Sequence, residues 1–125
     1  MSLRRSFLSA LPMLALAACG RQAPIQEGGG EFLGRGTLAE RELSIRRAGA
    51  SLGWTMQDAG PGRFRGTLDL RSHQAVVEIP YDTQRFTIRY VSSTNLNAGP
   101  GVIHPNYNGW VQNLQAAIIR ESGIR

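Results

Sequence analysis

Hydrophobic and polar residues alternate through the middle of the chain, which is the pattern of β-strands with one buried face. Three runs show this alternation, with inward positions at Phe64, Gly66, Leu68 and Leu70, then Ala75, Val77, Ile79 and Tyr81, then Phe86, Ile88 and Tyr90. A shorter strand, Trp54 to Asp58, precedes them. Because all of these segments place their apolar residues on one face, the sequence predicts an antiparallel meander.

Two short turns are expected to connect the longer strands, at Ser72–His73 and at Thr83–Gln84. The turn positions fix the register, because a hairpin pairs residues at equal distances from its turn. The resulting cross-strand pairs include Leu68 with Val77, Tyr81 with Phe86, and Glu78 with Arg89 on the solvated face.

Helical periodicity flanks the strands on both sides. Thr37 to Glu40 fits a capping box, and the helix that it opens should end near Leu52, where Gly53 supplies a left-handed residue. A second helix should begin at Pro105 and end at Gly123. Its apolar positions at helical spacing are Tyr107, Trp110, Val111, Leu114, Ala117 and Ile118.

These elements predict one α+β domain over residues 37–125. We expect two layers in the order α-β-β-β-β-α, an antiparallel meander sheet with both helices on one face. Tyr107 and Trp110 are expected to be core anchors of that fold, because they share the apolar stripe of the second helix.

Residues 1–18 have the features of a signal peptide. Arg4 and Arg5 form a positive start, and the stretch from Phe7 to Ala18 is almost entirely apolar. An apolar run of this length is too short to cross a bilayer core of about 30 Å as a permanent helix. The four residues from Leu16 to Cys19, "LAAC", resemble the lipobox of bacterial lipoproteins.

In the lipoproteins that carry this motif, signal peptidase II cleaves before the cysteine, which then receives acyl chains on its thiol and its amino group. The resemblance therefore implies a membrane partner, reached through lipidation of Cys19. Gly20 stands where an aspartate often marks inner-membrane retention in that family, so the outer membrane is favoured, with the domain on its periplasmic face. Leu3 to Leu8 also resembles the twin-arginine export motif, and both this route and the general secretory route stay open.

Residues 19–36 are interpreted as the lipidated cysteine followed by a flexible tether. Gly20 to Gly36 is glycine-rich and aperiodic, and a coil of this length would hold the domain about 20–25 Å from the membrane. Gly28 to Gly30 lacks the lysine and hydroxyl of a phosphate-binding loop, which favours a linker.

The positive charge of the chain raises the question of whether it binds nucleic acid. It has fourteen basic residues, all arginine, against nine acidic ones. Cleavage before Cys19 would leave twelve arginines and nine acids, a side-chain charge of +3. Nucleic acid is not an expected partner of an exported, lipid-anchored domain, despite this positive charge. With a single cysteine, no intramolecular disulfide can form.

Polar residues gather in the segment Ile103 to Trp110, "IHPNYNGW", and in the preceding loop, Ser92 to Gly101. The candidate ligand or partner contacts among them are Asn95, His104, Tyr107 and Asn108. One interpretation is that the loop and the helix start satisfy each other's polar groups; the other is a small polar pocket. Gly109, which costs about 1 kcal/mol inside a helix, suggests that a neighbour packs closely on it.

Two longer stretches carry a second resemblance. "IPYDTQRFTIRYVSSTNLN" and "IHPNYNGWVQNLQAAI" resemble a group of small proteobacterial lipoproteins of uncharacterised function. These proteins pair an "I-Y" strand and an S-x-N-L loop with an I-H-x-x-Y-N-x-W helix start. The match covers Ile45 to about Ile118, and it implies a fold and a location but no activity.

The sequence does not predict an enzyme, a metal site or a cofactor. His73 lies in a predicted turn and His104 in a loop, with no second ligand near either along the chain. No nucleophile has a base at a recognisable spacing, and Asp69 and Glu78 lack a partner carboxylate.

Two functional hypotheses follow. The first is a structural or interaction accessory of the cell envelope, whose partner is an envelope protein or peptidoglycan. The second is a small-ligand-binding module that uses the region of Asn95, His104 and Asn108. An open strand edge or an exposed apolar patch favours the first, and a concave pocket at His104 favours the second.

Overall fold

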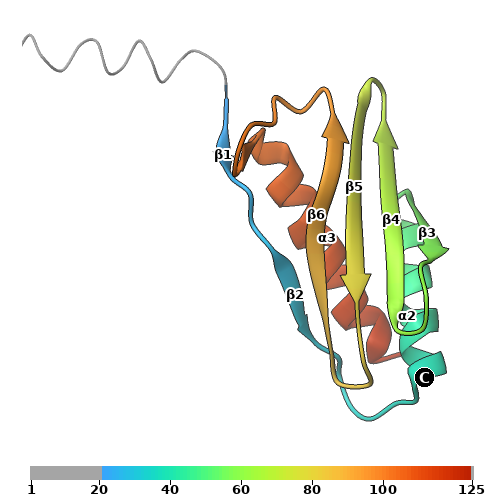
Figure 1. Cartoon of the computed structure of the whole chain (residues 1–125). Helices are drawn as coiled ribbons and strands as arrows, with labels where there is room; N and C mark the ends of the chain where they lie inside the picture. Colours follow the sequence, from blue (N-terminus) through green and yellow to red (C-terminus); the bar gives the residue numbers. More distant parts are fainter. Residues whose placement is uncertain (1–20, 125) are drawn as a thin grey trace, which may run out of the picture.

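The computed structural model describes residues 21–124, from β1 (Ala23–Pro24) to the end of α3 (Pro105–Ser122) (Figure 1). The expected signal peptide, Cys19 and Gly20 lie outside the described residues. Between the two ends the chain forms β2 (Gly28–Glu31), α2 (Leu38–Ser51), β3 (Trp54–Asp58), β4 (Arg63–Leu70), β5 (His73–Pro80), β6 (Arg85–Thr94) and β7 (Val102–Ile103).

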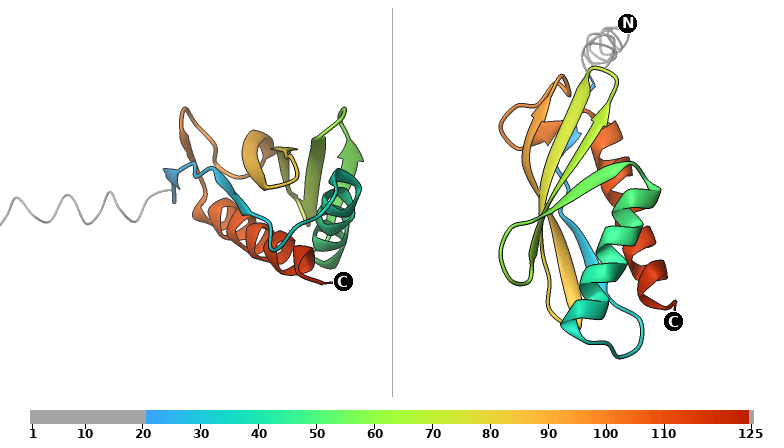
Figure 2. Two further views of the ribbon diagram at one scale, coloured as in Figure 1. Left: turned by 90° about the horizontal axis from the view of Figure 1, so that it is seen from below. Right: turned by 90° about the vertical axis from the view of Figure 1, so that its right-hand side faces the viewer.

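The main sheet has five antiparallel strands in the order β2-β6-β5-β4-β3, and β1 pairs with β7 in a separate two-stranded sheet. Both helices cover the same face of the main sheet, so the domain has two layers (Figure 2). This arrangement confirms the predicted α+β class, with its antiparallel meander and its helices on one face.

The prediction of a flexible tether is wrong for the residues that the structure describes, because this segment supplies two strands. β2 pairs with β6 along the register Gly28–Ile88 to Glu31–Arg85 and becomes a fifth strand of the sheet. Its glycines are needed for space: a Cβ on Gly28 would lie 2.6 Å from Val111 Cγ1 of α3. The glycine run therefore permits close packing of β2 on the helix.

The register of β4 and β5 differs from the prediction by two residues. Leu68 pairs with Ala75, and Leu70 with His73, so the turn is Arg71–Ser72. Arg71 takes the left-handed conformation (φ 59°) that such tight hairpin turns require. A shift of two keeps every side chain on its predicted face, because successive strand residues alternate.

The other predicted pairings of the sheet are confirmed. Tyr81 bridges Phe86, and Glu78 stands opposite Arg89. A bulge in the pairing of β5 with β6 lies between Val76 and Val77.

The helix ends follow their sequence signals. Thr37 and Glu40 form the expected capping box: the Thr37 amide donates to Glu40 Oε1 (2.8 Å), and the Glu40 amide donates to Thr37 Oγ1 (3.1 Å). Gly53 has φ +84°, and Gly123 caps α3 after Ser122.

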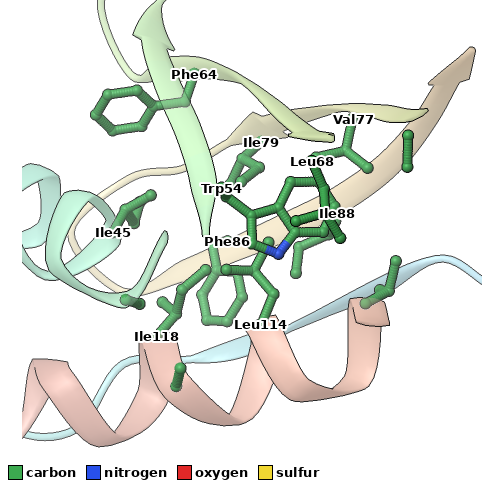
Figure 3. Packing of buried hydrophobic residues seen from close by; sticks show 14 of the residues in the cluster. Ile45, Trp54, Phe64, Leu68, Val77, Ile79, Phe86, Ile88, Leu114 and Ile118 are labelled. Atoms are coloured by element: carbon green, nitrogen blue, oxygen red, sulfur yellow. The ribbon is translucent and has the colours of Figure 1, made fainter. Parts of the chain in front are cut away.

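The core fills the space between the sheet and the helices. Side chains from α2, α3 and four strands meet there (Figure 3): Ile45, Trp54, Phe64, Leu68, Val77, Ile79, Phe86, Ile88, Leu114 and Ile118. Arg41 is also buried, with 2% of its surface exposed. Its guanidinium donates to the carbonyls of Leu33, Gly34 and Thr83. It also lies 4.8 Å from the centre of the Phe32 ring. Arg41 therefore ties α2 to the segment that precedes the helix.

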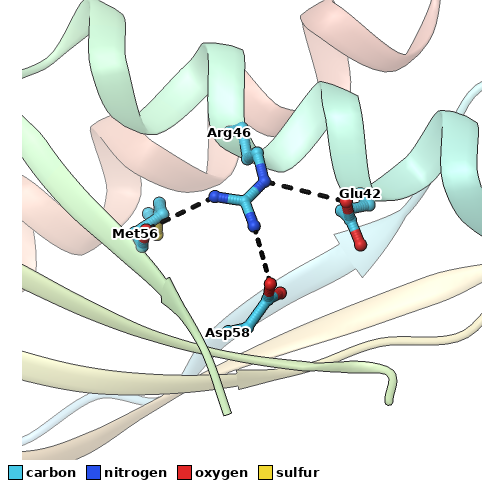
Figure 4. A network of polar contacts seen from close by, with 4 residues as sticks. All are labelled: Glu42, Arg46, Met56 and Asp58. Atoms are coloured by element: carbon cyan, nitrogen blue, oxygen red, sulfur yellow. Dashed lines mark hydrogen bonds and ion pairs between the residues drawn. The ribbon is translucent and has the colours of Figure 1, made fainter. Parts of the chain in front are cut away.

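The outer strand β3 is joined to α2 by Arg46. Its guanidinium contacts Asp58 Oδ2 (3.0 Å), Glu42 Oε2 (3.7 Å) and the carbonyl of Met56 (3.5 Å) (Figure 4). Among residues 21–124 no further strand pairs with the outer edge of β3. Charged groups along an edge of this kind discourage unspecific strand addition.

Candidate functional site

A pocket of about 300 Å³ opens beside the start of α3. It is lined by His73, Asn95, Leu96, Asn97, His104, Asn106 and Trp110. The fold thus brings together Asn95 and His104, two of the predicted site residues, and adds His73, the first residue of β5. The lining contains no carboxylate, arginine or aliphatic amine, so the pocket suits a polar ligand without strong charge.

The loop between β6 and β7 is shaped by two asparagines in the left-handed conformation, Asn95 (φ 59°) and Asn97 (φ 54°). Asn95 also attaches the loop to the β4–β5 turn. Its side-chain amide donates to Ser72 Oγ (3.0 Å), and its carbonyl lies 2.7 Å from His73 Nδ1. These bonds fix one wall of the pocket.

The two histidines offer complementary groups. A carbonyl oxygen only accepts, so His73 Nδ1 must carry the proton that it shares with Asn95, and the neutral ring keeps a lone pair on Nε2. His104 caps α3 in the opposite tautomer: its Nδ1 accepts from the Asn106 amide (3.1 Å), so the neutral ring carries its proton on Nε2. One ring nitrogen is therefore left to accept a hydrogen bond and the other to donate one.

The structure does not bring Tyr107 and Asn108 into this pocket. Both are buried, whereas Trp110, predicted as a core anchor, is only partly buried and lines the pocket. The expectation that a neighbour packs on Gly109 is wrong, because a Cβ placed there meets no atom within 4 Å.

Tyr107 is an aromatic anchor with an unusual hydroxyl. Its ring packs edge-on against Tyr90, with the centroids 5.4 Å apart, and no exposed surface remains. Within residues 21–124 its buried hydroxyl has no hydrogen-bond partner. Burial, and to a lesser extent Tyr90, raises the pKa of the Tyr107 phenol above its ordinary value.

Asn108 belongs to a row of polar side chains on α3 that the sequence reasoning missed. Asn108, Gln115 and Ser122 lie seven residues apart, and each bonds the backbone of the N-terminal segment. Asn108 accepts from the Gln26 amide (3.0 Å) and donates to the Pro24 carbonyl (2.9 Å). We call these three side chains the α3 ladder.

The other two side chains of the α3 ladder contact β2 and the chain just after it. Gln115 Oε1 accepts from the amide of Gly29, and Ser122 Oγ accepts from the amide of Leu33. An edge strand normally exposes such amides. The ladder therefore binds one amide on the outer edge of β2 and backbone groups on either side of that strand. The interpretation that the loop Ser92–Gly101 and the helix start satisfy each other's polar groups is wrong for Asn108.

The described chain begins beside the pocket. Gln22 Nε2 donates to the Asn97 carbonyl (2.9 Å), and Asn97 Nδ2 donates to the Arg21 carbonyl (3.4 Å). β1 then pairs with β7, directly before His104. The structure thus joins the segment that follows Cys19 to a wall of the pocket.

Among residues 21–124 no three His, Cys, Asp or Glu side chains are grouped as a metal ion would require, and neither helix is long and apolar enough to span a membrane. The sequence matches no protein-family model and no curated protein sequence.

Proposed function

We propose that the protein is a lipid-anchored accessory of the bacterial cell envelope, acting on the periplasmic side, with the outer membrane as the favoured location. The proposal of a lipid anchor is based on the lipobox-like motif at Cys19. The preference for the outer membrane is based on Gly20, which stands where an aspartate often marks inner-membrane retention. The structural observation that supports this role is that Arg21 and Gln22, two and three residues after the proposed acylation site, hydrogen-bond with Asn97 of the domain. A domain joined so closely to its lipid would act at the membrane surface.

The partner of such an accessory would be an envelope protein or peptidoglycan. The outer edge of β3 offers one surface for a protein partner, since an extended peptide can add to an unpaired strand. Nucleic acid is not proposed as a partner, and the proposal requires no catalysis.

Mass spectrometry of the mature protein tests the anchor. We expect acyl mass on Cys19 and recovery of the protein with membranes, whereas Cys19→Ala should lack the acyl mass and be misprocessed. Wild-type protein that is found wholly in the soluble periplasmic fraction, without acyl mass, would contradict the proposal.

A second candidate function, binding of a small polar ligand, is favoured by the pocket between His73 and His104. The two ring nitrogens and the Trp110 ring suit a neutral ligand with hydroxyl and amide groups, such as an N-acetylated sugar of peptidoglycan. This function is compatible with the first, because an anchored accessory can hold a wall fragment.

Binding of soluble peptidoglycan fragments, followed by NMR, tests the second function. We expect chemical-shift changes at His73, His104 and Trp110, with His104→Ala weakening binding severalfold. The matched control is Asn113→Ala on the exposed side of α3, which should bind as wild type does. Absence of shifts at the pocket residues, in protein that is folded, would exclude these fragments as ligands.

A further inference from the structure

Three segments meet at one end of the domain, which we call the anchor end: residues 21–24, the Arg71–Ser72 turn and residues 95–101. Figure 1 shows them at the same end of the sheet, away from the β5–β6 turn and the end of α3. Hydrogen bonds join them: residues 21 and 22 contact Asn97, and Asn95 contacts the turn at Ser72. The anchor end is therefore one continuous surface.

The covalent chain limits how far this surface can lie from an acylated Cys19. Gln22 is the third residue after Cys19, and an extended chain covers at most about 3.3–3.6 Å per residue, or roughly 11 Å over these three steps. The interfacial layer on each side of a bilayer is about 5–8 Å thick. Acyl chains in the bilayer would consequently keep the anchor end at or just above the lipid headgroups.

The side chains of the anchor end suit such a surface. Arg21 and Arg71 are exposed, and within residues 21–124 neither is paired with a carboxylate. Beside Arg71, Leu70 has 44% of its surface exposed at the tip of the hairpin. The one nearby acid, Asp69, accepts from Gln74 (2.9 Å). Basic side chains near a bilayer are attracted to the phosphates of anionic lipid.

The opposite end has a different character. The β5–β6 turn consists of Asp82, Thr83 and Gln84, all exposed, and Asp82 Oδ1 accepts from the amides of Gln84 and Arg85. These bonds lower the pKa of the Asp82 carboxyl, which keeps it negatively charged. The adjacent Arg85 is exposed but lies 3.5 Å from Glu31, so this turn offers anionic lipid less unpaired positive charge than the anchor end does.

We propose that the anchor end docks on the bilayer, with Arg21 and Arg71 on anionic headgroup phosphates and Leu70 in the interfacial layer. The domain then has one orientation, with its β5–β6 turn farthest from the membrane. This inference rests on the proposed lipidation of Cys19 and adds a fixed contact surface to it.

Site-specific fluorescence on the full mature protein tests the orientation. Acylation leaves no free thiol on Cys19, so Ser72→Cys and Thr83→Cys each supply a single labelling site, at opposite ends of the domain. The protein is reconstituted in vesicles of phosphatidylethanolamine and phosphatidylglycerol that contain a headgroup-attached quencher. We expect severalfold stronger quenching at position 72 than at position 83. Equal quenching at both positions would overturn the docking.

A charge variant tests the role of the basic side chain. Arg71→Gln in the Ser72→Cys protein should lose the part of the quenching that depends on phosphatidylglycerol, and high salt should have the same effect. Arg65→Gln, which removes an exposed arginine near the start of β4, away from the anchor end, should retain this part of the quenching. Equal effects of the two substitutions would overturn the assignment of Arg71 to the headgroups.

Acyl mass is measured on each sample first, which separates the two proposals. Protein that lacks acyl mass would overturn the anchor and the docking together. Protein that is acylated and equally quenched at both ends would overturn the docking and leave the anchor standing.

Discussion

Asn108 binds the backbone of Gln26 across the interface between α3 and the N-terminal segment, with its Oδ1 3.0 Å from the Gln26 nitrogen. The same side chain donates to the Pro24 carbonyl, so one amide group satisfies two backbone groups of a segment 82 and 84 residues away along the chain. This contact explains why a polar residue is buried on the helix.

Asn108→Ala should therefore destabilise the domain by about 1–3 kcal/mol, because it leaves partly buried backbone groups without partners. Urea denaturation followed by circular dichroism measures the difference. Asn113→Ala, on the exposed side of the same helix, is the control and should change stability by less than about 0.5 kcal/mol. If the two variants unfold at the same urea concentration, the ladder contact has no structural value.

Two glycine substitutions should have opposite signs. Gly28→Ala forces a Cβ to within 2.6 Å of Val111 Cγ1 and should cost about 1–3 kcal/mol through overpacking. Gly109→Ala meets no neighbour within 4 Å inside α3 and should stabilise by up to about 1 kcal/mol, the difference in helix propensity. The melting temperatures of both variants, compared with wild type, test these signs. A Gly28→Ala variant with an unchanged melting temperature would argue against close packing of β2 on α3.

Tyr107→Phe should leave stability at neutral pH unchanged or slightly higher, because it removes a buried hydroxyl that has no partner among the described residues. The pKa of the Tyr107 phenol is raised in the folded state. The contribution of the protonated phenol to the free energy of unfolding is therefore complete below the unfolded pKa of about 10. It is lost as the pH rises above that value, because there the unfolded chain releases the proton more readily than the folded one. Urea titrations across the alkaline range should show a smaller loss of stability for Tyr107→Phe than for wild type.

The two faces of β5 should respond differently to substitution. Ile79 is fully buried, so Ile79→Ala should cost about 2–5 kcal/mol. Glu78 lies on the solvated face, 3.9 Å from Arg63, and such an exposed pair contributes about 0.2–1 kcal/mol, so Glu78→Gln should shift the melting temperature only slightly. Reversed magnitudes would mean that the faces are exchanged.

The two helices and the strands β3 to β6 could be predicted, because the sequence of each element has its own periodicity or capping residues. Alternation places Phe64 and Ile79 inward, and the capping box at Thr37 marks where α2 begins. The register of the β4–β5 hairpin could not be fixed, because turns at Arg71–Ser72 and Ser72–His73 keep the same residues on the same face.

β2 and the contribution of His73 to the pocket could not be predicted, because their signals are distributed along the chain, whereas Asn95 and His104 are candidates from the sequence alone. The glycines of β2 show no alternation, and the complementary signal is the seven-residue spacing of Asn108, Gln115 and Ser122, far away on α3. Likewise His73 and His104 line one pocket only after the hairpin and the helix start have been brought together by the fold.

The α3 ladder also determines how the domain would respond to mechanical tension. A pull applied through a lipidated Cys19 would reach the β1–β7 pair first and then β2, which is held by β6 on one side and by Gln115 on the other, with Ser122 holding Leu33 just after it. If a partner holds the far end of the sheet, the pulling force would act along the direction of β2. The hydrogen bonds between β2 and β6 would then be loaded together and would not break one after another. If the proposed anchor exists, force between the membrane and a partner of the domain would be carried mainly by the bonds of β2, once the short β1–β7 pair has been loaded.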